Sequence, residues 1–260
     1  VQSCDVYYYE LAERVGIDKI AEMARRLGLG DRFDLPLSAV HAGLVPDKDW
    51  KRRARGMDWM IGMTLNSAIG QGDVLASPLQ LAVMTARLAT GEGIHPRLVK
   101  SVNGRETPIR NDGPLGLSPT TLAQIRKAMH DVSNHRRGTA YRSRIVDDAM
   151  TVAGKTGTSQ VRSVVVRNED VPWEERDHAL FVAFAPFDAP RIAVSVVVEH
   201  GGGGSTAAAP IARDIIARAL HGDLPPMEVF PRSERQRIED LWSTLPLRDR
   251  RGGGTGSDRA

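Results

Sequence analysis

The chain has 260 residues, a formal net charge of +3 and a hydrophobic content of 41%, which is an ordinary globular composition. Its basic residues form no long stripe, and no apolar run approaches the ~20 residues needed to cross a bilayer, so neither nucleic-acid binding nor a membrane span is indicated within these residues. The single cysteine, Cys4, excludes an internal disulfide. Because the chain starts at Val1 inside a helix-like pattern, we expect it to be the C-terminal part of a longer protein.

The first part of the chain is predicted to be helical and then irregular. Apolar spacing predicts a helix over Asp5–Val15 that ends at Gly16, and a second helix over 18–27 that Asp18 caps. Residues 29–76 are rich in Gly, Pro and charge and show little periodicity. We therefore expect a long irregular region there, and such regions inside compact domains are usually functional.

Two Ser-Pro pairs mark the starts of further helices. A hydroxyl N-cap followed by Pro at the first helical position predicts helices after Ser77 and after Ser118, the first of which ends at Gly91. Residues 149–153 are then predicted to form a short strand that leads into Gly-Lys-Thr-Gly at 154–157.

The last third of the chain predicts two strands and a covering helix. Residues 179–185 form a continuous apolar run, and residues 192–198 alternate with a period of two. The short turn at 186–190 predicts that these strands pair as an antiparallel hairpin. After the glycines at 201–204, apolar spacing predicts a helix over about 207–220.

Helices followed by strands with a covering helix predict an α+β fold rather than alternating βαβ units. We expect an antiparallel sheet covered by helices, with an adjoining all-helical lobe and a truncated N-terminus. Residues 1–222 should form one domain. Residues 223–260 should be a largely disordered tail with one weak helix near 234–242.

The strongest chemical signal is the hexapeptide Gly-Lys-Thr-Gly-Thr-Ser at 154–159. An exposed Lys beside two hydroxyls offers a carboxylate one cation and two hydrogen-bond donors. A glycine lets a ligand backbone approach closely, and a free backbone N–H on such a strand stabilises an oxyanion. Taken alone, the segment is better explained as a strand end with a surface lysine and threonines. A phosphate loop is excluded, because the required upstream glycine is absent.

A second signal, Ser3-Cys4-Asp5, lies at the start of the first predicted helix. Ser3 is either the N-cap of that helix or a hydroxyl that relays a proton to a leaving amine. In the second reading Asp5 orients side chains across a cleft.

Together these signals resemble two of the three motifs of the penicillin-binding protein and β-lactamase superfamily, in which Ser-x-Asp/Asn on a helix precedes Lys-Thr-Gly on a strand. Further segments are similar to the class B penicillin-binding proteins: Ala68-Ile69-Gly70-Gln71-Gly72 and Ser77-Pro78-Leu79-Gln80. The segments at 3–9, 155–161 and 177–186 resemble the branch of that class that acts in cell elongation.

The resemblance implies a peptidoglycan D,D-transpeptidase that cross-links stem peptides through a serine acyl-enzyme and is the target of β-lactams. Lys155 would bind the substrate carboxylate, and the Thr158 N–H would form half of the oxyanion hole. Asp5 would occupy the place where many relatives have Asn. The implied catalytic residues are Ser3, Asp5, Lys155 and Thr158, and the implied substrate-binding residues are Thr156, Gly157 and Thr158.

The third motif of the superfamily, Ser-x-x-Lys, carries the acylated serine, and no serine of the 260 residues has a lysine three positions later. In the family this motif precedes Ser-x-Asp, so we expect it before Val1 and expect this chain alone to be inactive. The resemblance implies no required cofactor. Some relatives use a cysteine at this place together with upstream Asp and His residues as a zinc site. Cys4 is therefore a candidate ligand of a structural zinc, the alternative being a small buried residue.

The resemblance also implies a place and partners for the whole protein. It would lie at the periplasmic face of the bacterial inner membrane, anchored by an upstream transmembrane helix, with a membrane glycosyltransferase of the elongation machinery as partner and no nucleic acid. Two alternatives stay open: a hydrolase of the same fold (a D,D-carboxypeptidase or β-lactamase) and a non-catalytic penicillin-recognition module. Residues 162–176 are expected to overhang the cleft.

Overall fold

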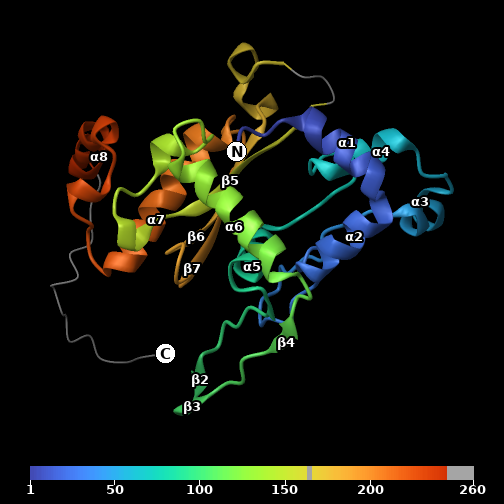
Figure 1. Ribbon diagram of the computed structural model, residues 1–260, viewed down its shortest axis with the longest axis horizontal. Helices are drawn as coiled ribbons and strands as arrows, with labels where there is room; N and C mark the ends of the chain where they lie inside the picture. The colour runs from blue at the N-terminus through green and yellow to red at the C-terminus, as the bar shows by residue number, and fades with distance from the viewer. Residues whose placement is uncertain (163–165, 245–260) are drawn as a thin grey trace.

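The computed structural model describes residues 1–162 and 166–244 (Figure 1). Its helices are α1 (Asp5–Val15), α2 (Ile17–Arg26), α3 (Lys48–Arg55), α4 (Ile61–Ala68), α5 (Pro78–Thr90), α6 (Pro119–Asn134), α7 (Ala209–His221) and α8 (Arg232–Thr244). Its strands are β1 (Glu92–Ile94), β2 (Ser101–Val102), β3 (Arg105–Glu106), β4 (Asn111–Pro114), β5 (Ala153–Ser159), β6 (His178–Ala185) and β7 (Ile192–Val198). No helix in the described residues is long and apolar enough to cross a membrane.

The helices α1 to α4 gather beside the sheet as a helical lobe, on the right of Figure 1. Within it, α1 packs against both α2 and α4. The predicted first helix is confirmed, and it ends at Gly16, which has φ +80°. The predicted cap of the second helix is wrong: α2 starts at Ile17, and the Asp18 carboxylate instead accepts a hydrogen bond from the Lys48 N–H.

The region predicted to be irregular contains two short helices, so that prediction is partly wrong. Asp47 caps α3 by accepting from the Trp50 N–H at 2.7 Å, and Gly56 ends it in a left-handed conformation. Lys51 is only 6% exposed and pairs with Asp73 at 3.1 Å. Each helix has only eight residues, too few for a clear apolar period to show among the charges.

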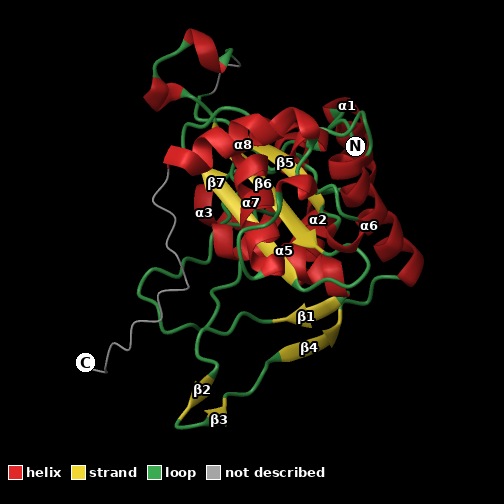
Figure 2. Ribbon diagram, turned by 90° about the vertical axis from the view of Figure 1, so that its left-hand side faces the viewer, coloured by secondary structure: helices red, strands yellow, loops and turns green. Residues whose placement is uncertain are grey.

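The two helices predicted from Ser-Pro pairs are confirmed. Ser77 and Gln80 form a reciprocal capping box at the start of α5, which ends at Gly91. Ser118 caps α6 by accepting from the Thr121 N–H. Between these helices the chain leaves the body of the protein as two small antiparallel pairs, β1–β4 and β2–β3, at the bottom of Figure 2.

The central sheet is antiparallel with the order β5-β6-β7, and the predicted hairpin of β6 and β7 is confirmed. Alternate residues of β6 point to opposite faces. Phe181 packs with the cluster under α7, and Phe184 packs with the cluster that α5 and α6 contribute. The predicted strand at 149–153 is wrong, because Asp148–Met150 is a 3₁₀ turn. The strand β5 starts later, so the Lys-Thr-Gly sequence lies inside it.

The C-terminal part of the described chain packs on the sheet through α7 and α8. Phe230 and Ile238 are both fully buried, and the guanidinium of the buried Arg213 lies 5.1 Å from the Phe230 ring centre. Residues 223–244 are therefore packed against the core rather than forming part of a disordered tail, while the predicted weak helix is present within α8. The rest of the predicted tail, 245–260, lies outside the described residues.

Candidate active site

A lysine of the sheet meets a serine of the helical lobe. Lys155 pairs with Val182 in the β5–β6 register, so its side chain leaves the face of the sheet that α5 and α6 cover. From there Nζ donates to the Ser3 Oγ at 2.8 Å and to the Thr156 carbonyl at 2.6 Å. The structure thus brings together two candidate residues that are 152 positions apart in the sequence.

The backbone before α1 directs the Ser3 side chain toward this contact. Ser3 has φ +51°, in the left-handed region that only glycine adopts freely. The N-cap of α1 is Cys4, whose side chain makes no capping hydrogen bond. The interpretation of Ser3 as the helix cap is therefore wrong, and its hydroxyl faces the lysine instead.

The electrostatic setting of Lys155 combines two opposing effects. Burial of the ammonium lowers the pKa of Lys155 below its ordinary value, and the negative charge of Asp5 raises that pKa and partly offsets the burial. Asp5 is the first residue of α1, where the helix dipole also favours its negative charge. Asp5 thus acts on Lys155 through its charge.

The free edge of β5 faces the helical lobe, and we name the region between this edge and Ser3 the groove. Residues 153–159 pair with β6 on one side only. Gln71 Nε2 donates to the Thr158 carbonyl at 2.9 Å, so this carbonyl points away from β6. Because the N–H and C=O of one strand residue point the same way, the Thr158 N–H also points into the groove. It is therefore oriented as an oxyanion donor needs to be.

The hydroxyls of Thr156 and Thr158 project from one face of β5 and the Lys155 side chain from the other, because side chains alternate along a strand. The Thr156 hydroxyl is hydrogen-bonded to the Thr139 hydroxyl at 2.9 Å, whereas Thr158 is exposed. A carboxylate that reached both the lysine and a threonine would have to lie at the open edge of the strand.

The backbone packs closely at Gly157, but this approach depends on Gly204, since a Cβ at Gly157 itself would meet only the Leu180 Cβ at 3.3 Å. The turn before α7 lies directly over it: a Cβ at Gly204 would come within 2.5 Å of the Gly157 carbonyl and 2.3 Å of the Leu180 carbonyl. This packing holds β5 against the rest of the fold at the level of the lysine and threonines.

Two residues of the site were not identified from the sequence. Gln71 comes from the Gly-Gln-Gly sequence, which was used only as a family resemblance, and Thr139 follows a glycine just after α6. Only the pair of glycines around Gln71, with φ of +78° and +73°, signals that its side chain is presented by a sharp turn.

The residues described do not fit a metal centre. Cys4 is exposed, which contradicts the reading of a small buried residue, and no group of three or more His, Cys, Asp and Glu side chains able to hold an ion occurs in residues 1–162 and 166–244. One thiol does not make a zinc site, and Cys4 as a zinc ligand stays a prediction.

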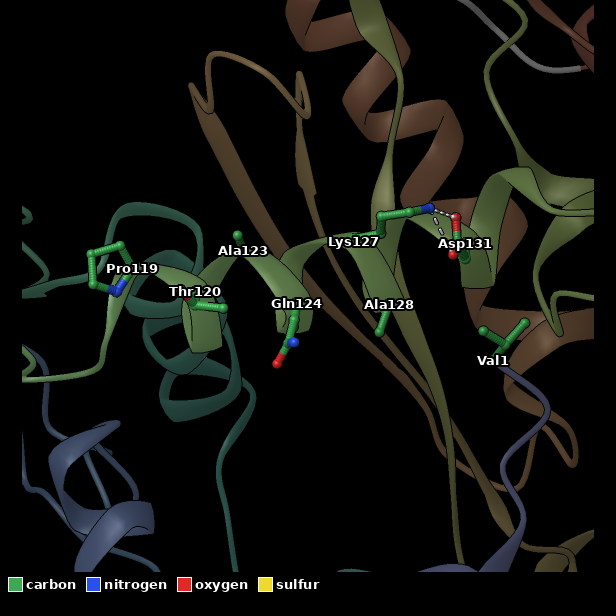
Figure 3. A pocket seen from close by; sticks show the side chains of 8 residues that line it. All are labelled: Val1, Pro119, Thr120, Ala123, Gln124, Lys127, Ala128 and Asp131. Atoms are coloured by element: carbon green, nitrogen blue, oxygen red, sulfur yellow. Dashed lines mark hydrogen bonds and ion pairs between the residues drawn. The ribbon is translucent and has the colours of Figure 1, made fainter.

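Two further features lie outside the Ser3–Lys155 contact. A hollow of about 700 Å³ runs along α6, and Figure 3 shows its lining residues and the ion pair of Lys127 with Asp131 at 3.0 Å. Of the segment expected to overhang the cleft, residues 163–165 are outside the described part. The exposed Trp173 of that segment contacts the ring of His200, with ring centres 4.7 Å apart.

Comparison with known proteins agrees with this geometry. Residues 1–217 match the penicillin-binding protein transpeptidase domain. The peptidoglycan D,D-transpeptidase MrdA of Acinetobacter baumannii is 38% identical over 218 residues, which are 80% of this chain and 32% of that protein. The MrdA of Haemophilus influenzae is 32% identical over 88% of this chain and 37% of its own length, so the chain spans about a third of these relatives.

Solved structures show the same similarity. The crystal structure of Pseudomonas aeruginosa PBP2 in complex with WCK 5153 superposes with a TM-score of 0.74 at 36% identity, covering 87% of this chain and 50% of that one. The complex of PBP2 with MreC from Helicobacter pylori gives a TM-score of 0.73 at 34% identity, covering 85% of this chain and 39% of that one. Because the family model matches residues 1–217, the chain belongs to the penicillin-binding protein transpeptidase family.

Proposed function

We propose that the protein containing this chain is a peptidoglycan D,D-transpeptidase of cell elongation, which cross-links stem peptides and is acylated by β-lactams. The observation that carries the proposal is the 2.8 Å contact between Ser3 and Lys155, which joins the two motifs in one groove. The similarity to MrdA proteins and PBP2 structures supports the same assignment.

The roles of the groove residues follow from their chemistry. The Lys155 ammonium attracts the carboxylate of a peptide or a β-lactam, and its hydrogen bond to Ser3 orients that hydroxyl. The Ser3 hydroxyl both accepts and donates, so it passes a proton toward a leaving amine. The Thr158 N–H donates to the oxygen that becomes negatively charged when the carbonyl is attacked. Thr156 and Thr158 hydroxyls add donors to the carboxylate at the edge of β5.

The acylated serine of this reaction would come from chain that precedes Val1. None of the 260 residues completes a Ser-x-x-Lys sequence, and this chain matches only 32% and 37% of the length of two curated relatives. This chain would then supply one wall of the active site, the oxyanion donor and the proton relay, and would be inactive by itself.

The whole protein would act at the periplasmic face of the inner membrane with a membrane glycosyltransferase that polymerises glycan. This is consistent with a similar PBP2 from Helicobacter pylori that was solved with MreC, and with another similar chain from a peptidoglycan synthase complex that couples polymerization and crosslinking.

The test uses the protein with its upstream sequence. Fluorescent penicillin should label one serine of that protein covalently, and Lys155→Ala should abolish the labelling. With a peptide donor ending in D-Ala-D-Ala and an amine acceptor, the product should be the cross-linked peptide. Transfer to water alone would instead identify a carboxypeptidase or β-lactamase, and the absence of any acylation would identify a recognition module.

A further inference from the structure

Gln71 is held at a fixed position by the way α4 ends. The Gly70 N–H donates to the Ser67 carbonyl at 3.0 Å and the Gln71 N–H donates to the Asn66 carbonyl at 2.9 Å. With Gly70 at φ +78°, these two bonds form a Schellman motif, the commonest rigid ending of a helix. Gly72, at φ +73°, then turns the chain away. The backbone of Gln71 is thus anchored to the helical lobe while its side chain crosses to the sheet.

The Gln71 amide pairs with the free edge of β5 as a neighbouring strand would. Its Nε2 donates to the Thr158 carbonyl at 2.9 Å, and its Oε1 accepts from the Gln160 N–H at a longer 3.5 Å. Gln71 thus gives one bond to, and accepts one bond from, residues two positions apart, which is the pattern that a residue of a parallel neighbouring strand makes. The side chain therefore lies in the plane of the sheet, where the backbone of an added peptide would run.

A peptide that binds this edge needs the acceptor that Gln71 now uses, the carbonyl oxygen of Thr158. In an antiparallel pair, a residue that accepts from the Thr158 N–H also donates its own N–H to the Thr158 carbonyl. A ligand whose carbonyl oxygen lies at the Thr158 N–H therefore brings an amide N–H to the carbonyl that now accepts from Gln71. The ligand N–H and the Gln71 amide cannot both lie in the plane of the sheet at this edge.

We propose that Gln71 is a displaceable placeholder for the amide N–H of the acylating ligand. This inference rests on the proposed function. In the ligand-free protein the Gln71 amide satisfies the edge of β5, and an acyl-peptide ligand exchanges one hydrogen bond to Thr158 for another. Gln71 is in this sense a positioning residue: a ligand that brings an N–H to the Thr158 carbonyl must first displace it, and it does not touch the reacting carbonyl.

The test compares two classes of β-lactam with the protein that carries the acylated serine. One class has an acylamino side chain, which offers an amide N–H, and the other has a hydroxyethyl side chain, which does not. In Gln71→Ala, the second-order acylation rate constant for the acylamino compound should rise about two- to tenfold. This factor corresponds to one ordinary hydrogen bond, the one between Gln71 and Thr158, which the ligand no longer has to break. The rate constant for the hydroxyethyl compound should stay the same.

Two further variants help to interpret the ratio of the acylamino rate constant to the hydroxyethyl rate constant. Gln71→Met keeps the length of the side chain without an amide and should behave like Gln71→Ala. Gln124→Ala, which removes an exposed glutamine of α6, should leave both rate constants unchanged. If both rate constants fall together in the Gln71 variants, Gln71 instead holds the helical lobe and the sheet together, and the proposal is wrong. It is also wrong if the ratio of the two rate constants does not change. If neither compound acylates the unaltered protein, the proposed function fails, and this inference fails with it.

Discussion

Ser3 Oγ and Lys155 Nζ lie 2.8 Å apart, and this contact joins the helical lobe to the sheet. The hydroxyl comes from the residues before α1 and the ammonium from the middle of β5, so each of the two parts contributes one chemical group.

Replacing Ser3 by Ala should slow acyl transfer without unfolding the protein. The exposed Ser3 side chain contributes little buried surface, whereas a positioned proton relay contributes about 10²- to 10⁴-fold to a rate. We expect a loss in that range, measured as the rate of fluorescent penicillin labelling of the protein that carries the acylated serine. Ser101→Ala, on the exposed strand β2, is the matched control. An unchanged rate in Ser3→Ala would remove Ser3 from the mechanism.

Replacing Asp5 by Asn should lower the pKa of Lys155 further. The burial that lowers this pKa remains in the variant, while the charge that raises it is gone. The titration of Lys155, followed by NMR of its side-chain carbon next to Nζ, should therefore move to lower pH. Asp58→Asn, at an exposed position of the helical lobe, should leave it in place. A shift to higher pH would show that Asp5 does not act on the lysine through its charge.

The same lowered pKa has a consequence for stability. Between the lowered pKa and the ordinary Lys value of 10.5, the unfolded chain binds more protons at this site than the folded one. The free energy of unfolding should therefore gain a contribution from Lys155 as the pH rises through that interval. Urea unfolding of Lys155→Met compared with the unaltered chain, across that pH range, should show the slope only when the lysine is present.

Replacing Gly204 by Ala should destabilise the sheet beneath the groove. The added Cβ would meet the Leu180 and Gly157 carbonyls at 2.3 and 2.5 Å, and backbone atoms cannot move aside as a flexible side chain can. We expect a loss of about 3 kcal/mol in the free energy of unfolding, the upper range for overpacking. Gly62→Ala meets nothing within 4 Å in α4 and should be neutral or stabilise by up to about 1 kcal/mol. Equal effects of both changes would contradict the tight contact.

Replacing Phe230 by Ala should show that the chain after residue 222 belongs to the domain. Phe230 is fully buried beneath Arg213, and such a truncation costs about 3–5 kcal/mol in a packed core. Leu224→Ala, at a position 44% exposed, is the control and should cost less than about 1 kcal/mol. Chemical denaturation of both variants gives the comparison, and a cost near zero for Phe230→Ala would restore the prediction of a largely disordered tail.

The elements that sequence reasoning predicted well carry strong local signals. Ser-Pro pairs and terminal glycines located α5 and α6, and the apolar runs located β6 and β7, because capping and alternation act within a few residues. The start of β5 was misplaced, since the glycines at 154 and 157 weaken the strand pattern, although a Cβ at Gly154 would meet the Phe181 ring at 2.4 Å and packing therefore requires glycine there.

The site was less accessible to such reasoning. That Ser3 and Lys155 meet followed from a family resemblance and not from any property of the intervening residues. The roles of Gln71 and Thr139 depend on contacts with a distant strand, which no local pattern encodes. Gln80 is similar: its fully buried amide donates to the carbonyls of Asp31 and Ala42 and so fixes the long connection that looked irregular.

The separation of 152 positions between Ser3 and Lys155 also orders events during synthesis. At about 5–20 residues per second, the ribosome adds Lys155 roughly 8 to 30 seconds after Ser3. Within the helical lobe, α1 packs against α2 and α4, which are complete by residue 68, whereas β5 still needs β6 as its partner. The catalytic groove should therefore be among the last parts of the nascent protein to assemble, and a ribosome-bound chain that stops before β6 should hold a formed lobe without a groove.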